Sequence, residues 1–368
     1  MNPAASATSR LPLADALKAI AAQIIVLHHL IHYGPMSNAA YDLAPWLFDW
    51  MDQYGRMAVQ VFLVVGGYLA ARTLMPAATP VNWDILPQIG RRYLRLVIPY
   101  TAALVLAIGL SAVARQLMDH DSISAPATAP QVTAHLLLVQ GLLNYESLSA
   151  GVWYLAIDFQ LYSLLALMLW LPRKTGWSRL ALPAIMILMT VSLFHFNLNS
   201  DWDNWAPYFF GSYAIGALAY WATVRNRNWS CAAGITLVCG LALLMDFRWR
   251  ILLALATALI LLAPLRMAWF EKLITSRPIA FLSQISFATF LVHFPVCLVV
   301  NGLFVRFELT HPVANAFGVV LAWLASLAMG ALFYRVIGQG LMPRLGMARR
   351  VKPKAAPALP VNTSKQTS

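Results

Sequence analysis

Ten apolar runs dominate this 368-residue chain, and nearly all are long enough to cross a bilayer as helices. A helix needs about 20 residues to span roughly 30 Å of hydrocarbon. The runs lie at residues 13–33, 57–75, 96–117, 151–171, 180–198, 205–224, 231–246, 250–265, 281–304 and 313–337. Only 11% of the residues are charged, against about 25% in soluble domains, which excludes a soluble enzyme. We therefore expect an all-α polytopic membrane protein with about ten transmembrane helices.

The placement of charge predicts the orientation of these helices. With a cytoplasmic N-terminus and alternating spans, the cytoplasmic segments hold 21 of the 26 lysines and arginines. The opposite side then holds ten of the 14 acidic residues. Because positive charge marks cytoplasmic loops, we expect both termini in the cytoplasm. The net charge of +12 is explained by this orientation, so we expect no nucleic-acid partner.

The same pattern divides the chain into three parts. Residues 1–12 are a short cytoplasmic N-terminus, without the pattern of a cleaved signal peptide. Residues 13–340 form one transmembrane domain, and residues 341–368 are a basic tail that we expect to be disordered. The apolar stretch at 132–143 is too short to span, so we expect it to be re-entrant or interfacial.

The first span is the richest in polar side chains. Lys18 and His29 are eleven residues apart, which places them on one helix face at about 16 Å along the axis. Asp15 lies one turn before Lys18 and can pair with it. Two interpretations remain open, because Lys18 could equally extend to the inner headgroups and His28 and His32 could lie at the outer interface. The histidines lack the further ligands of a metal centre, so we expect no metal.

The second span and the segment after it suggest further contacts. Gly66 and Gly67 allow close helix packing, and Tyr68 beside them offers a hydroxyl. The following segment, RRYLRLVIPY, has two interpretations, which are orienting charge and a clamp for phosphate groups. Its basic residues are Arg91, Arg92 and Arg95.

Two later spans carry polar groups that need partners in an apolar environment. Asp158 lies in the fourth span without an adjacent base, so we expect a cation or histidine on another helix to pair with it. His293 lies near the middle of the ninth span, with Pro295 two residues later. A packed core histidine and a catalytic histidine both fit this position.

These segments, in this order, resemble the membrane acyltransferase-3 family of bacterial O-acyltransferases. DALKAIA…LHH is similar to the family pattern DGLRAIA…FH, VFLVVGGYL to FFVISGYL, RRYLRLVIPY to RRLLRIYPPY, WYLAIDFQLYSLL to WSLSVEEQFYLL, and ISFATFLVHFPV to ISYSLYLWHFPV. Three departures from these patterns bear on function. Lys18 replaces an arginine, Gly66 replaces a serine, and Phe159 stands at the second of two glutamates, whereas Asp158 matches the first.

The resemblance implies acyl transfer from a cytoplasmic acyl-CoA, with acetyl-CoA the expected donor, to a hydroxyl of an envelope glycan or glycolipid. It implies a multi-pass protein of the bacterial inner membrane. His29 would be the general base, with either direct transfer or an acyl-histidine intermediate. Lys18 would lie beside the donor, and Tyr68, Asp158 or His293 would orient His29 or stabilise the oxyanion. The CoA phosphates would be bound by Arg91, Arg92 and Arg95.

Two other functional classes are compatible with part of this pattern. Lysine, aspartate and histidine within spans can also form the proton relay of a transporter, although no internal repeat is evident. A non-catalytic scaffold is the third class, but a scaffold gains little from the cost of inserting His29, Asp158 and His293.

Overall fold

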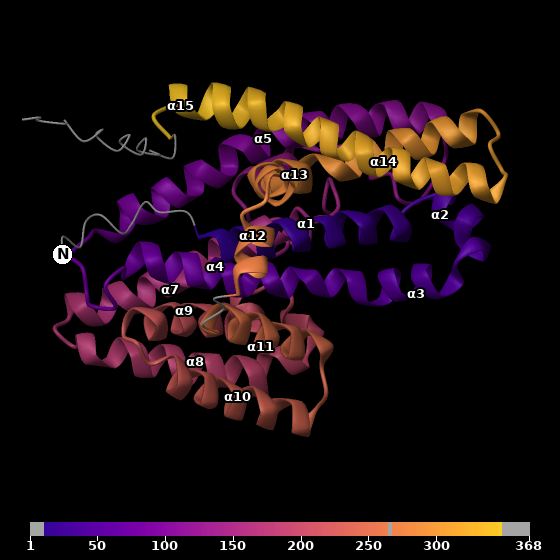
Figure 1. Cartoon of the computed structure of the whole chain (residues 1–368). Coiled ribbons are helices and arrows are strands. Elements are labelled where there is room, and N and C mark those ends of the chain that lie inside the picture. The colour runs from indigo at the N-terminus through magenta and orange to yellow at the C-terminus, as the bar shows by residue number, and fades with distance from the viewer. Residues whose placement is uncertain (1–10, 264–266, 348–368) are drawn as a thin grey trace, which may run out of the picture.

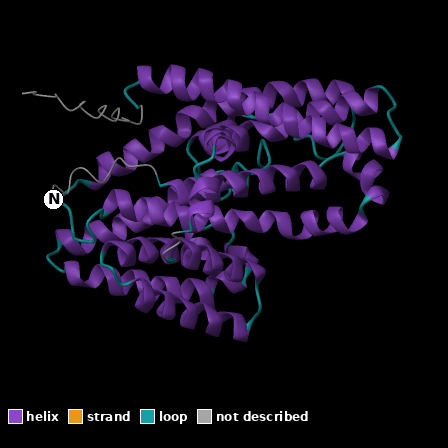
Figure 2. Ribbon diagram, viewed as in Figure 1, coloured by secondary structure: helices purple, strands orange, loops and turns teal. Residues whose placement is uncertain are grey.

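The chain is a bundle of helices without strands in the described residues, which are 11–263 and 267–347 of a computed structural model (Figures 1 and 2). The longer helices are α1 (Pro12–His32), α3 (Pro45–Tyr54), α4 (Val59–Leu74), α5 (Ile85–Leu117), α7 (Trp153–Lys174), α8 (Ala181–Phe194), α9 (Ala206–Val224), α10 (Asn228–Met245), α11 (Trp249–Leu262), α13 (Arg277–Arg306) and α14 (Pro312–Phe333). The shorter ones are α2 (Pro35–Ala40), α6 (Ala129–Leu136), α12 (Ala268–Ile274) and α15 (Met342–Arg344).

Each of the ten predicted spans contains a helix within the described residues. In the described residues, eight helical segments are long and apolar enough to cross a membrane, which confirms an all-α polytopic membrane protein. The two other predicted spans are α9, which is not among those eight segments, and α11, which has 14 residues. The final helix ends at Arg344, and residues 348–368 of the predicted tail lie outside the described part.

The second predicted span begins earlier than its apolar run. A helical segment of 30 residues extends from Pro45 through a short 3-10 turn at Gly55–Ala58 to Leu74. Proline at the first helical position favours this start, because its missing N–H would lack a partner there anyway. The segment before residue 57 is therefore a helix that projects beyond the apolar run, and not a loop.

Helices α4 and α9 approach each other through two glycines. A Cβ atom at Gly67 would lie 1.8 Å from the carbonyl oxygen of Tyr213, and one at Gly216 would lie 1.8 Å from that of Val64. Neither distance is possible for a real side chain, so only glycine permits this contact. The predicted role of Gly67 in close helix packing is thus confirmed.

The stretch at 132–143 does not span. Helix α6 ends at Leu136 and turns follow. His135 is fully buried, and burial lowers its pKa, so the ring is neutral. Its Nδ1–H donates to the carbonyl of Gln131 at 2.8 Å, and Nε2 accepts from the backbone N–H of Leu148 at 3.2 Å. His135 thereby fixes the segment that leads to Gly151 at the start of α7.

Candidate active site

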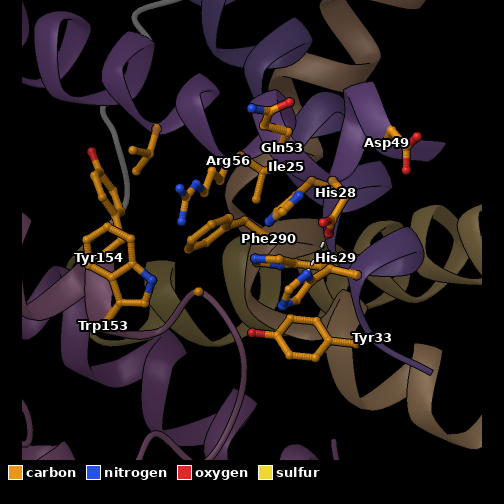
Figure 3. A pocket seen from close by; sticks show the side chains of 14 residues that line it. Ile25, His28, His29, Tyr33, Asp49, Gln53, Arg56, Trp153, Tyr154 and Phe290 are labelled. Atoms are coloured by element: carbon orange, nitrogen blue, oxygen red, sulfur yellow. Dashed lines mark hydrogen bonds and ion pairs between the residues drawn. The ribbon is translucent and has the colours of Figure 1, made fainter. Parts of the chain in front are cut away.

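A cavity of about 810 Å³ opens where α1 ends and where α4 and α7 begin. Figure 3 shows Trp153 and Tyr154 on one side, the histidines on the other, and Phe290 between them. The lining combines aromatic, acidic and basic side chains. It consists of Ile25, His28, His29, His32, Tyr33, Asp49, Asp52, Gln53, Arg56, Val59, Gly151, Trp153, Tyr154 and Phe290.

Helix α3 fixes two of the three histidines of α1. His28 donates from Nδ1 to the carbonyl of Met51 at 3.1 Å, and His32 Nδ1 lies 2.6 Å from Asp52 Oδ1. The rings of His28 and His32 stack with their centres 5.4 Å apart, as expected one turn apart on a helix. Both rings are therefore held by the neighbouring helix.

His29 has a different partner, His293 of α13. Its Nδ1 lies 2.7 Å from Nε2 of His293, and the two rings are nearly parallel at 5.0 Å. Nδ1 of His293 lies 2.9 Å from the carbonyl oxygen of Phe290 and 3.2 Å from that of Thr289. The structure thus joins the polar groups of the first and ninth spans, which are 264 residues apart.

These contacts determine the tautomers. A carbonyl oxygen only accepts, so Nδ1 of His293 carries a hydrogen, and in the neutral ring Nε2 does not. His293 Nε2 must then accept from Nδ1–H of His29, which leaves Nε2 of His29 unprotonated. This nitrogen has no hydrogen-bond partner among the described residues, and His29 lines the cavity. The arrangement can take a proton from a bound group.

Helix α3 and the 3-10 turn after it contribute cavity residues that were not predicted from the sequence. Asp49, Asp52, Gln53 and Arg56 all line the cavity. Their spacing of three and four residues places them on one face of a helix. The spacing is visible in the sequence, but these residues precede the apolar run at 57–75 and so fall outside the predicted spans.

A second polar cluster lies inside the bundle, around Asp158 of α7. Arg92 of α5 forms an ion pair with its carboxylate, which confirms the expected partner on another helix. The guanidinium also lies 5.2 Å from the ring centre of Tyr162. Gly66 borders this cluster, since a Cβ there would lie 3.5 Å from Asp158 Oδ1 and 3.2 Å from the Tyr213 ring.

The remaining predicted residues lie away from the cavity. Lys18 pairs with Asp15 at 2.9 Å, as its spacing predicted. Tyr68 contacts the ring of Tyr220 edge to face. Neither Lys18 nor Tyr68 lines the cavity that contains His29. Arg91 and Arg95 are exposed, whereas Arg92 forms the ion pair with Asp158.

The chemistry available at this site is proton transfer next to a polar and aromatic binding surface. In the described part of the chain, no three His, Cys, Asp or Glu side chains gather as a metal site would require. Comparison with known families shows that residues 13–335 match the family model Acyl_transf_3, described as an acyltransferase domain. No curated protein and no solved structure matches the chain.

Proposed function

Because this chain belongs to the acyltransferase-3 family, and is thus a multi-pass membrane acyltransferase, we propose that it acylates a hydroxyl. The donor is a cytoplasmic acyl-CoA, with acetyl as the expected group. The acceptor is a glycan or glycolipid that enters the cavity from the opposite side of the inner membrane. The observation that supports this proposal best is the His29–His293 pair at a polar and aromatic cavity.

In this mechanism His29 is the general base. Its unprotonated Nε2 takes the proton of the acceptor hydroxyl while the oxygen attacks the thioester carbonyl. The C–S bond then breaks, CoA leaves as the thiolate, and His29 returns the proton to it. A two-step route through acyl-His29 uses the same nitrogen and stays open. His293 is a positioning residue, because it holds the tautomer of His29.

Two cavity residues are suited to stabilise the negative charge that develops on the thioester carbonyl oxygen during attack. Arg56 is a cation and Gln53 a neutral donor, and both line the cavity with His29. Donors of this kind stabilise an oxyanion when they are fixed before the reaction. Trp153, Tyr154 and Phe290 supply flat apolar faces, which suit the C–H faces of a sugar ring.

The donor would approach from the other end of the bundle. Exposed Arg91 and Arg95 are available to the CoA phosphates. Arg92, engaged by Asp158, would instead lie beside the pantetheine arm. Tyr154 connects the two regions, because it lines the cavity and lies one turn of α7 before Asp158.

The test is transfer of radiolabel from acetyl-CoA to envelope glycans in membranes that contain the protein. We expect His29→Ala to reduce transfer by about 10²- to 10⁴-fold, the usual contribution of a general base. His195→Ala is the matched control, since His195 is exposed and lies outside the cavity. The variants must be inserted in equal amounts.

Two outcomes would contradict the proposal. Equal label transfer by His29→Ala and wild type would remove His29 from the chemistry. Proton-coupled uptake of a solute by reconstituted wild type, without consumption of acetyl-, succinyl- or longer acyl-CoA, would favour the transporter alternative.

A further inference from the structure

A second cavity, of about 340 Å³, lies at the end of the bundle opposite the histidines. It is formed where α4, α7 and α9 end and α8 begins, the end that the charge pattern predicts to face the cytoplasm. It shares no lining residue with the first cavity. Its lining consists of Leu74, Met75, Ala78, Pro80, Val81, Trp83, Leu169, Arg173, Ser178, Arg179, Ala181, Leu182, Ile185, Trp221 and Arg225.

One wall of this cavity, the loop at 75–84, is held in place by side chains of α7 and α9. Arg173 donates to the carbonyl oxygens of Val81 and Trp83, the latter at 2.6 Å, and lies over the Trp83 ring. Arg225, at the end of α9, donates to the carbonyl of Ala78 at 2.6 Å. The cavity is therefore bounded by fixed structure on this side.

The polar lining of the cavity is suited to an anion. Three arginines line it and no carboxylate does. Arg173 and Arg225 donate hydrogen bonds to carbonyl oxygens of the loop, whereas Arg179 has no partner among the described residues. Trp221 lines the cavity and is only 4% exposed.

The rest of the lining is apolar and continues onto the membrane-facing surface. Leu182 of α8 lines the cavity and is 37% exposed, and Met186, one turn further along the helix, is 48% exposed. Ile185 and Leu169 form the buried apolar side. A ligand here would therefore be an anion with an attached hydrocarbon chain.

We propose that this cavity binds the headgroup phosphate of an anionic phospholipid from the adjacent leaflet. Arg179, which is exposed and lines the cavity, supplies the cation. One acyl chain follows the exposed apolar face of α8. Basic side chains at the cytoplasmic surface attract anionic lipids by about 1 kcal/mol each, and a preformed cavity adds specificity to this attraction.

The test is native mass spectrometry of the full chain released from nanodiscs that contain phosphatidylglycerol and phosphatidylcholine. Wild type should retain phosphatidylglycerol in preference to phosphatidylcholine. Arg179→Gln should lower the phosphatidylglycerol-bound fraction about fivefold. Arg344→Gln, an exposed arginine outside both cavities, should leave the bound fraction unchanged.

Three results would overturn the lipid assignment. Wild type could show no preference between the two lipids. Arg179→Gln could behave like Arg344→Gln. Added CoA could displace phosphatidylglycerol in an Arg179-dependent manner, which would assign the cavity to the acyl donor. His29→Ala should bind the lipid as wild type does, so failure of the acyl-transfer mechanism would leave this proposal standing.

Discussion

At the scale of single residues, His293 matters because it accepts a hydrogen bond from His29 inside the protein. His293→Leu removes that acceptor and leaves Nδ1–H of His29 unpaired. We expect kcat for acyl transfer to fall about 10- to 100-fold, which is the cost of an unsatisfied buried donor, with KM for the acceptor little changed. His293→Gln retains an acceptor oxygen and should recover part of the rate. If both variants lose activity only in proportion to lost folded protein, His293 is purely structural.

The Arg92–Asp158 pair predicts an asymmetry between its two partners. The side chain of Asp158 is 6% exposed and that of Arg92 is 33% exposed. Arg92→Gln leaves a buried carboxylate without its cation, so we expect a loss of about 3 kcal/mol or more in stability. Asp158→Asn leaves an arginine whose side chain can reach a more polar region, so the loss of stability should be smaller than for Arg92→Gln.

The measurement for this pair is a double-mutant cycle by thermal unfolding in detergent. The combined variant, Arg92→Gln with Asp158→Asn, should be more stable than Arg92→Gln alone, because no buried charge then lacks a partner. Simple additivity of the two single effects would contradict a direct pairing.

The sequence identifies His29, His293, Arg92 and Asp158 as candidate residues, but it does not show which of them contact each other. Spacing along one helix placed Lys18 next to Asp15, a contact within a single turn. It could not join His29 to His293, because that contact depends on how two distant helices rotate and pack against each other. The position of Asp158 within an apolar span was enough to predict that it needs a partner. Only the packed structure shows that this partner is Arg92.

At the scale of helices, the α4–α9 contact depends on glycine. Gly67→Ala places a methyl group against the carbonyl of Tyr213, so the helices must separate. We expect a loss of several kcal/mol, or failure to insert. Gly240→Ala in α10 is the matched control, since a Cβ there meets nothing within 4 Å. Because alanine favours a helix more than glycine does, Gly240→Ala should leave the free energy of unfolding unchanged or raise it by about 0.5–1 kcal/mol.

Thermal unfolding of the two glycine variants in the same detergent makes this comparison direct. Equal midpoints for Gly67→Ala and Gly240→Ala would contradict the close contact.

The apolar pattern predicted that the second span exists, and the glycine pair suggested close packing. The apolar pattern could not predict α3, because its residues Asp49, Asp52 and Gln53 are polar and line a cavity that forms only in the folded bundle.

For the whole molecule, the direction of acyl transfer depends on which end of the bundle faces the cytoplasm. The positive-inside rule predicts that the end with Lys174 is cytoplasmic and that the histidine cavity opens on the opposite side. The two cavities lie at opposite ends, so one orientation determines the location of both. The proposed donor and acceptor sides would exchange if this orientation were reversed.

Cysteine labelling tests that orientation. In a variant with Cys231, Cys239 and Cys297 replaced by alanine, a new cysteine is placed at exposed Asp42 or exposed Lys174. A membrane-impermeant maleimide should label Asp42→Cys in intact spheroplasts, and Lys174→Cys only after lysis. Both should react in detergent, which controls for accessibility. Labelling of Lys174→Cys before lysis would reverse the predicted orientation and place the His29 cavity on the cytoplasmic side.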